Sequence, residues 1–260
     1  SGSASAVDIG VSSASASVIL EDVLFGETYV CAGQSNMQLS VRQTNNSAWE
    51  EARAASLPGN FRIMQVSDLP SYYNVTTPQT NLSLSVPWGR PSADNVPYMS
   101  AACYYFGVER ITRHPNMPVG MIASSWGGTA IEAWMTSEAL ASCGVIAADD
   151  SSTSSVLSQM EVSASSSIVS SQALAVAPYP GPPHIHSTLW NSMLAPLARV
   201  ISVSGWLWYQ GESNAGNPER YTCTQPAMIA AFRSSFQHAS SAPFVFVQVS
   251  SWPTNDFGLV

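Results

Sequence analysis

Short runs of strand-forming residues alternate with longer segments of helical periodicity along most of this 260-residue chain. The predicted strands are 27–32, 61–66, 118–123, 203–209 and 244–249. The predicted helices are 98–113, 188–200 and 219–238, and a further helix starts in 35–42. Parallel strands need crossover connections, so this order predicts an α/β fold with a mostly parallel sheet covered on both faces.

Two segments lack either periodicity. Residues 67–97 form a long polar connection, and connections of that length are usually functional or peripheral. Residues 151–176 are Ser-rich and are predicted to be an insertion.

The charge balance argues against several kinds of partner. The net charge is −8, only 10% of residues are charged, and all nine cationic residues are Arg. No basic stripe offsets this balance, so neither nucleic acid nor an anionic membrane is expected as a partner. No apolar run reaches the ~18 residues that a membrane span requires.

Three N-glycosylation sequons begin at Asn45, Asn74 and Asn81. Their clustering in one polar region predicts a glycosylated protein of the secretory route, either lysosomal or secreted.

The four cysteines show neither a metal-site spacing nor a disulfide-dense pattern. Cys31 and Cys103 lie in apolar runs and are predicted to be buried thiols. Cys143 and Cys223 lie in polar surroundings and could pair in an oxidising compartment. His184 and His186 lack an accompanying carboxylate cluster, so no metal site and no cofactor are expected.

Three motifs follow predicted strands, where ligands bind in open α/β sheets. The first, GQSNM (33–37), places Ser35 at a strand-to-helix turn; alternatively, Ser35 only caps the helix. The second, IASSWGGTAIEAW (122–134), has paired glycines that allow close backbone approach, or simply form a tight turn. The third, WYQGESN (208–214), contains polar residues that core packing explains poorly, and Asn214 could donate to an oxyanion.

In this order, the three motifs resemble the signature segments of the sialate O-acetylesterase family, within the SGNH-hydrolase group. The similarity runs from about residue 22 to 251 and is weakest in 67–97 and 146–183. It implies a three-layer flavodoxin-like fold and removal of O-acetyl groups from sialic acids through an acyl-enzyme.

The resemblance also implies roles for individual residues. The nucleophile falls on Ser35, and the oxyanion donors fall on the Ser35 and Gly128 N–H groups and the Asn214 side chain. Cys143 and Cys223 look like family positions, so a disulfide is expected between them. Side chains expected to support the loops or contact substrate are Gln34, Gln210, Glu212 and Glu132.

One departure concerns the base that must activate Ser35. The family uses a His in an Asp-x-x-His segment, which none of His114, His184, His186 and His238 matches. We therefore expect residues 1–21 to end a preceding β-rich region and 22–260 to form an esterase domain lacking its C-terminal His-bearing segment. A second fragment of the same precursor is expected to carry the base.

Other functions remain compatible with the motifs. The same chemistry could act on another acetylated sugar, such as acetylxylan. A non-catalytic carbohydrate-binding relative or a structural glycoprotein would keep the motifs without the reaction.

Overall fold

The computed structural model describes residues 3–145, 181–237 and 239–249. Its centre is a six-stranded sheet in the order β5-β4-β6-β3-β7-β8. The strands are β3 (Glu27–Gly33), β4 (Phe61–Val66), β5 (Leu84–Gly89), β6 (Val119–Ser125), β7 (Gly205–Tyr209) and β8 (Phe244–Phe246). Every neighbouring pair is parallel except β4 and β5, which confirms the mostly parallel sheet.

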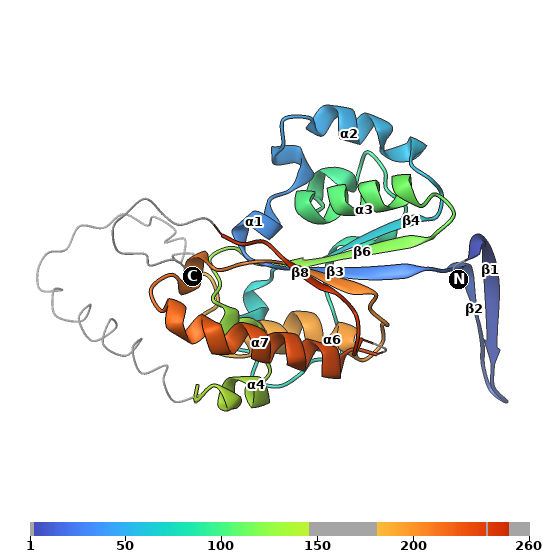
Figure 1. The fold of residues 1–260 in the computed structure, drawn as a ribbon. Helices are drawn as coiled ribbons and strands as arrows, with labels where there is room; N and C mark the ends of the chain where they lie inside the picture. Colours follow the sequence, from blue (N-terminus) through green and yellow to red (C-terminus); the bar gives the residue numbers. More distant parts are fainter. Residues whose placement is uncertain (1–2, 146–180, 238, 250–260) are drawn as a thin grey trace, which may run out of the picture.

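Helices cover both faces of this sheet (Figure 1). On one face lie α1 (Ser35–Gln38), α2 (Ser47–Arg53) and α3 (Ala101–Arg113). On the other lie α4 (Ser137–Ser142), α6 (Ala195–Ala198) and α7 (Pro218–Ser235), with a π-helical turn at Trp190–Leu194 leading into α6. The predicted three-layer arrangement is therefore present.

The core follows from the period of two in the strands, because successive side chains point to opposite faces. In β3, Val30 and Ala32 face the cluster under α7, whereas Cys31 faces the cluster under α3. In β6, Ile122 joins the first cluster, and Met121 joins the second. Strands buried on both faces read as continuous apolar runs, which is how the sequence displays them.

The five parallel strands, numbered along the chain, stand in the order 2-3-1-4-5. Flavodoxin itself has the order 2-1-3-4-5. The layers are therefore flavodoxin-like, while the first and third strands have exchanged places. As a result, β3 lies between β6 and β7 near the middle of the sheet.

Some predicted elements differ from the observed ones. The expected helix start at 35–42 is the four-residue α1 followed by a 3₁₀ turn at Val41–Gln43. The polar connection 67–97 contains the antiparallel edge strand β5, whose period is disturbed by Pro87 and by irregular pairing with β4. The expected Ser-rich insertion 151–176 lies outside the described residues.

Both pairs of cysteines form disulfides. Cys143 and Cys223 join the end of α4 to α7, the pairing expected above, with Cα atoms 5.8 Å apart. Cys31 and Cys103 were expected to be thiols, and this prediction was wrong: they join β3 to α3, also with Cα atoms 5.8 Å apart. Apolar surroundings correctly indicated burial of both residues, but the sequence does not show that α3 packs directly over β3.

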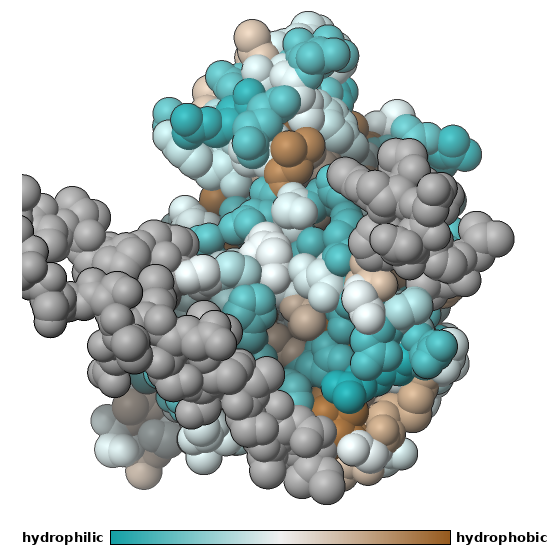
Figure 2. Space-filling model, turned by 90° about the vertical axis from the view of Figure 1, so that its left-hand side faces the viewer, coloured by the Kyte–Doolittle hydropathy of each residue, from teal (hydrophilic) through white to brown (hydrophobic). Residues whose placement is uncertain are grey.

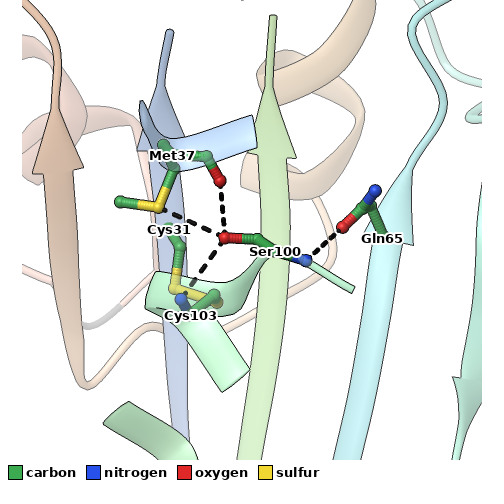
Figure 3. Close-up of a disulfide and its surroundings, with 5 residues drawn as sticks. All are labelled: Cys31, Met37, Gln65, Ser100 and Cys103. Atoms are coloured by element: carbon green, nitrogen blue, oxygen red, sulfur yellow. Dashed lines mark hydrogen bonds between the residues drawn. A yellow bond between two sulfur atoms is a disulfide. The ribbon is translucent and has the colours of Figure 1, made fainter. Parts of the chain in front are cut away.

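Beside the Cys31–Cys103 disulfide, Ser100 connects α3 to the neighbouring elements (Figure 3). As the N-cap of α3 it accepts a hydrogen bond from the Cys103 N–H, and its hydroxyl donates to the Met37 carbonyl at 2.6 Å. Its own N–H donates to Gln65 Oε1 at 2.7 Å. The start of α3 is thereby fixed to α1 and to β4.

A two-stranded hairpin of β1 (Ser3–Ser12) and β2 (Ser17–Phe25) forms a separate sheet at one end of the molecule (Figure 1). The pairing of Ile9 with Leu20 and of Val11 with Val18 gathers aliphatic side chains on one face. Val11 and Val18 remain more than half exposed. The domain boundary expected after residue 21 falls inside β2.

The helices of the described residues are too short or too polar to cross a membrane.

Candidate active site

The three sequence motifs meet at the carboxyl ends of β6, β3 and β7, which are neighbours in the sheet. Because these strands are parallel, the loops that follow them leave the same edge of the sheet. The helices after β3 and β7 pass to opposite faces (Figure 1), and open α/β sheets bind ligands outside the carboxyl ends of the strands at such a switch point.

Ser35 is the first residue of α1 and is exposed, so its hydroxyl is accessible to solvent. The chain reaches it through Gly33, whose φ of 143° lies in a region that side chains disfavour. A Cβ atom at Gly33 would lie 2.1 Å from the Tyr209 carbonyl oxygen. The Gln34 N–H donates to that same oxygen at 3.0 Å, so the turn carrying Ser35 is packed directly on β7.

The glycine motif lies directly beside Ser35. The Trp126 N–H donates to the Gly33 carbonyl at 3.0 Å, and a Cβ atom at Gly127 would be 3.4 Å from the Ser35 Cβ. Gly128 has a φ of 74°, and a Cβ atom there would lie 2.8 Å from Pro182 Cγ. The paired glycines therefore permit a close approach on both sides of this loop.

Gln38 holds the glycine loop against α1. Its Oε1 accepts a hydrogen bond from the Gly127 N–H at 2.7 Å, and its Nε2 donates to Asp68 at 2.9 Å. The sequence did not indicate this residue, because nothing in the order of residues shows that the two loops touch. Its place one helical turn after Ser35 was the only available signal.

The third motif packs on the other side of the Ser35 turn. Gln34 Oε1 accepts hydrogen bonds from the Ser213 N–H at 3.2 Å and the Gly211 N–H at 3.5 Å. Asn36 donates to one carboxylate oxygen of Glu212, and the second oxygen is buried without a hydrogen-bond partner in the structure. Both residues flanking Ser35 are thus bonded to this loop.

Asn214 lies in a buried cluster with two of the other predicted residues. Its Oδ1 accepts hydrogen bonds from the Ile131 N–H at 2.9 Å and from Gln210 Nε2 at 2.8 Å. Its Nδ2 donates to Glu132 Oε2 at 2.8 Å. The structure therefore brings Asn214, Gln210 and Glu132 together.

Tyr221 extends this cluster toward α7. Its hydroxyl donates to Gln210 Oε1 at 2.9 Å and accepts from Trp208 Nε1 at 3.1 Å. Burial raises the pKa of Tyr221 to about 12, which keeps the hydroxyl protonated as a donor. The sequence analysis predicted no role for Tyr221.

The histidines do not complete the site within the described residues. His114 ends α3, His184 is exposed, and His186 is half-buried with an Nδ1 atom that lacks a partner. None of these three is hydrogen-bonded to Ser35, and His238 lies outside the described residues. In the described part of the chain, His, Cys, Asp and Glu side chains do not gather in groups of three suited to a metal ion.

The face bearing the loop ends is shown in Figure 2. The visible part of this face carries mainly hydrophilic and neutral residues, with a few hydrophobic ones among them. An exposed serine hydroxyl with loop N–H groups and a buried amide beside it is an arrangement suited to acyl transfer through a covalent intermediate.

Comparison with known families identifies the family of the chain. A family model described as carbohydrate esterase, sialic acid-specific acetylesterase matches residues 26–168, more than half of the chain. The chain belongs to this family of carbohydrate esterases. The sequence resemblance and the fold class are both confirmed.

Individual relatives support the assignment over nearly the whole chain. The chain is 34% identical to human sialate O-acetylesterase over 244 residues and 37% identical to the mouse protein of that name over 257 residues. These matches cover 89% and 92% of this chain but only 41% and 46% of the relatives. The chain thus spans less than half the length of these relatives.

A crystal structure of a carbohydrate acetylesterase from Xanthomonas citri is similar in fold. It matches with a TM-score of 0.65 and 25% identity, covering 93% of this chain and 45% of that one.

The close approach at Gly33 gives a prediction about folding. Gly33→Ala should lower the free energy of unfolding by more than about 3 kcal/mol, because the new Cβ overlaps the Tyr209 carbonyl oxygen. Gly144→Ala is the matched control: φ is also positive, 71°, but a Cβ there meets nothing within 4 Å. It should cost only about 1 kcal/mol. Urea unfolding of both variants tests this, and equal losses would contradict it.

Proposed function

We propose that the protein is a serine esterase that removes O-acetyl groups from sialic acids. The observation that carries this proposal is the accessible Ser35, set between the glycine loop and the Asn214 loop at one edge of the sheet. Family membership supplies the substrate class.

In this mechanism Ser35 Oγ gives its proton to a base and attacks the carbonyl carbon of the acetyl ester. The N–H groups of Ser35 and Gly128 and the Asn214 side chain stabilise the resulting oxyanion. The C–O bond to the sugar breaks, the sugar leaves as an alcohol after taking the proton, and the acetyl group stays on Ser35. Water attacks this acyl-enzyme and releases acetate, which restores the serine.

Loop support follows from the hydrogen bonds described above. Gln34 and Asn36 bind the 211–213 segment from either side of Ser35, so the nucleophile and the Asn214 loop keep a fixed relation.

In the full-length protein, Ser35→Ala should abolish acetate release from O-acetylated sialic acid while leaving the melting temperature nearly unchanged, since the side chain is small and exposed. Ser137→Ala is the control, because Ser137 is also an exposed first residue of a helix. Retention of more than a few per cent of activity in Ser35→Ala would exclude Ser35 as the nucleophile.

A comparison of two substrates tests the sugar. Turnover of acetylxylan above that of the sialic acid ester would favour another acetylated sugar as the substrate class.

We further propose that the base comes from a segment of the same precursor outside residues 1–260. Two observations support this: the described histidines do not bond to Ser35, and the chain spans less than half the length of relatives in its family. Residues 1–21, with part of the exposed apolar hairpin, would end a β-rich region preceding the esterase domain.

This proposal predicts the outcome of replacing the four histidines of the chain. In the full-length protein, replacing His114, His184, His186 or His238 with Ala should each leave kcat within about threefold, because none of them acts as base. A fall of 100-fold or more in any one variant would place the base inside this chain. Steady-state acetate release measures all four.

We propose that the protein follows the secretory route, to the lysosome or to the exterior. Asn45, Asn74 and Asn81 are all exposed, as glycan acceptors must be, and two disulfides suit an oxidising compartment. Enzymatic removal of N-glycans from the natural protein should reduce its mass. If the mass does not change on this treatment and the four cysteines react as free thiols without prior reduction, this route is contradicted.

A further inference from the structure

We propose that Gln210 is a positioning residue that orients the side-chain amide of Asn214 so that one N–H of Nδ2 can bind the oxyanion. This inference rests on the proposed esterase function and deepens it. Asn214 can stabilise an oxyanion only through Nδ2, so the orientation of its amide decides whether the loop contributes to catalysis at all.

The orientation of Asn214 is determined by groups whose chemistry is unambiguous. The Ile131 backbone N–H can only donate, so the atom of Asn214 that it contacts at 2.9 Å must be the oxygen. Gln210 reinforces the same choice by donating from Nε2 to this oxygen at 2.8 Å.

Gln210 is itself oriented in the same way. Its Nε2 also donates to the Thr129 backbone carbonyl at 3.0 Å, an atom that can only accept. Its Oε1 accepts from the Tyr221 hydroxyl at 2.9 Å. That hydroxyl accepts from Trp208 Nε1, and the Gln210 backbone carbonyl, at 3.4 Å, is a second and more distant acceptor for its proton. Both amides therefore have one favourable orientation.

A rotated Asn214 amide would place its N–H groups against the donors of Ile131 and Gln210. Asn214 and Gln210 are buried, with 9% and 3% exposed, so water could not relieve the opposed donors. In the observed orientation one Nδ2 proton is given to Glu132. The second has no acceptor among the described residues, which leaves one N–H for the developing oxyanion.

The test is a double-mutant cycle on the full-length protein with O-acetylated sialic acid as substrate. Asn214→Ala should lower kcat by about 10²–10³ with little change in KM, as expected for an interaction made in the transition state. Gln210→Met, which keeps length but removes both polar atoms, should lower kcat by about 10-fold with KM within about threefold.

The effects of the two substitutions on kcat should not be multiplicative. In the Asn214→Ala background, Gln210→Met should lower kcat by less than about threefold, because its target is already absent. A full 10-fold loss in that background would overturn the inference, and would show that Gln210 acts through Thr129 and the glycine loop instead. A Gln210→Met effect confined to KM would also overturn it.

Asn191→Leu separates positioning from loss of fold. Asn191 is a buried amide, 5% exposed, that donates to the Val75 carbonyl away from Asn214. The Asn191→Leu variant should lose about as much melting temperature as Gln210→Met and keep an unchanged kcat. An equal fall in kcat would attribute the Gln210 effect to general destabilisation. If Ser35→Ala remains active, the proposed function fails; if Ser35→Ala is inactive and the cycle is multiplicative, only the positioning role fails.

Discussion

The pairing of β3 with β6 on one side and β7 on the other determines where the three loops of the candidate active site begin. Seven residue pairs join β3 to β6, from Glu27 with Val119 to Gly33 with Ser125. Five pairs join β3 to β7, ending at Gly33 with Tyr209. Because all three strands end at the same level, the segments beginning at Gln34, Trp126 and Gln210 start side by side. A slip of register would separate them and turn the apolar side chains to the wrong face.

The position of the turn at Gly33 follows from this strand pairing. The turn is also hydrogen-bonded to the segments on either side of it. The Gly33 carbonyl accepts from Trp126, the first residue after β6, and the Tyr209 carbonyl at the end of β7 accepts from Gln34, so the Ser35 turn is bonded to its neighbours on both sides. Behind the turn, the Cys31–Cys103 disulfide and the Ser100 hydroxyl anchor β3 and α1 to α3 (Figure 3). A catalytic side chain needs such support, because small displacements of the reacting groups cost much of the rate.

The sequence predicted this frame well, because short apolar strand runs, helical periodicity and strand-end motifs are local signals. Through the resemblance it predicted a nucleophile at Ser35 and oxyanion donors at Gly128 and Asn214; the structure places the loops that carry these residues together, and the roles stay predictions. It did not predict contacts between distant segments. Gln38 bonds to Gly127 across 89 residues, and Cys31 pairs with Cys103 across 72. The edge strand β5 was also missed, because an antiparallel strand with only one buried side chain, Val86, resembles a polar loop.

In the proposed mechanism the oxyanion donors are two backbone N–H groups and one side-chain amide, all of them neutral, and this suits the proposed reaction. The negative charge of the oxyanion exists only in the transition state and intermediate, so fixed N–H dipoles stabilise it without holding a permanent counterion. Such dipoles are effective only if they cannot rotate away, which in a buried amide depends on the partners of its other atoms. For Asn214 those partners are a backbone N–H, a glutamine fixed by a backbone carbonyl, and a carboxylate. Core packing could not explain the buried polar residues of the third motif in the sequence. In the proposed mechanism they hold one hydrogen-bond donor, the Asn214 amide, in a fixed orientation.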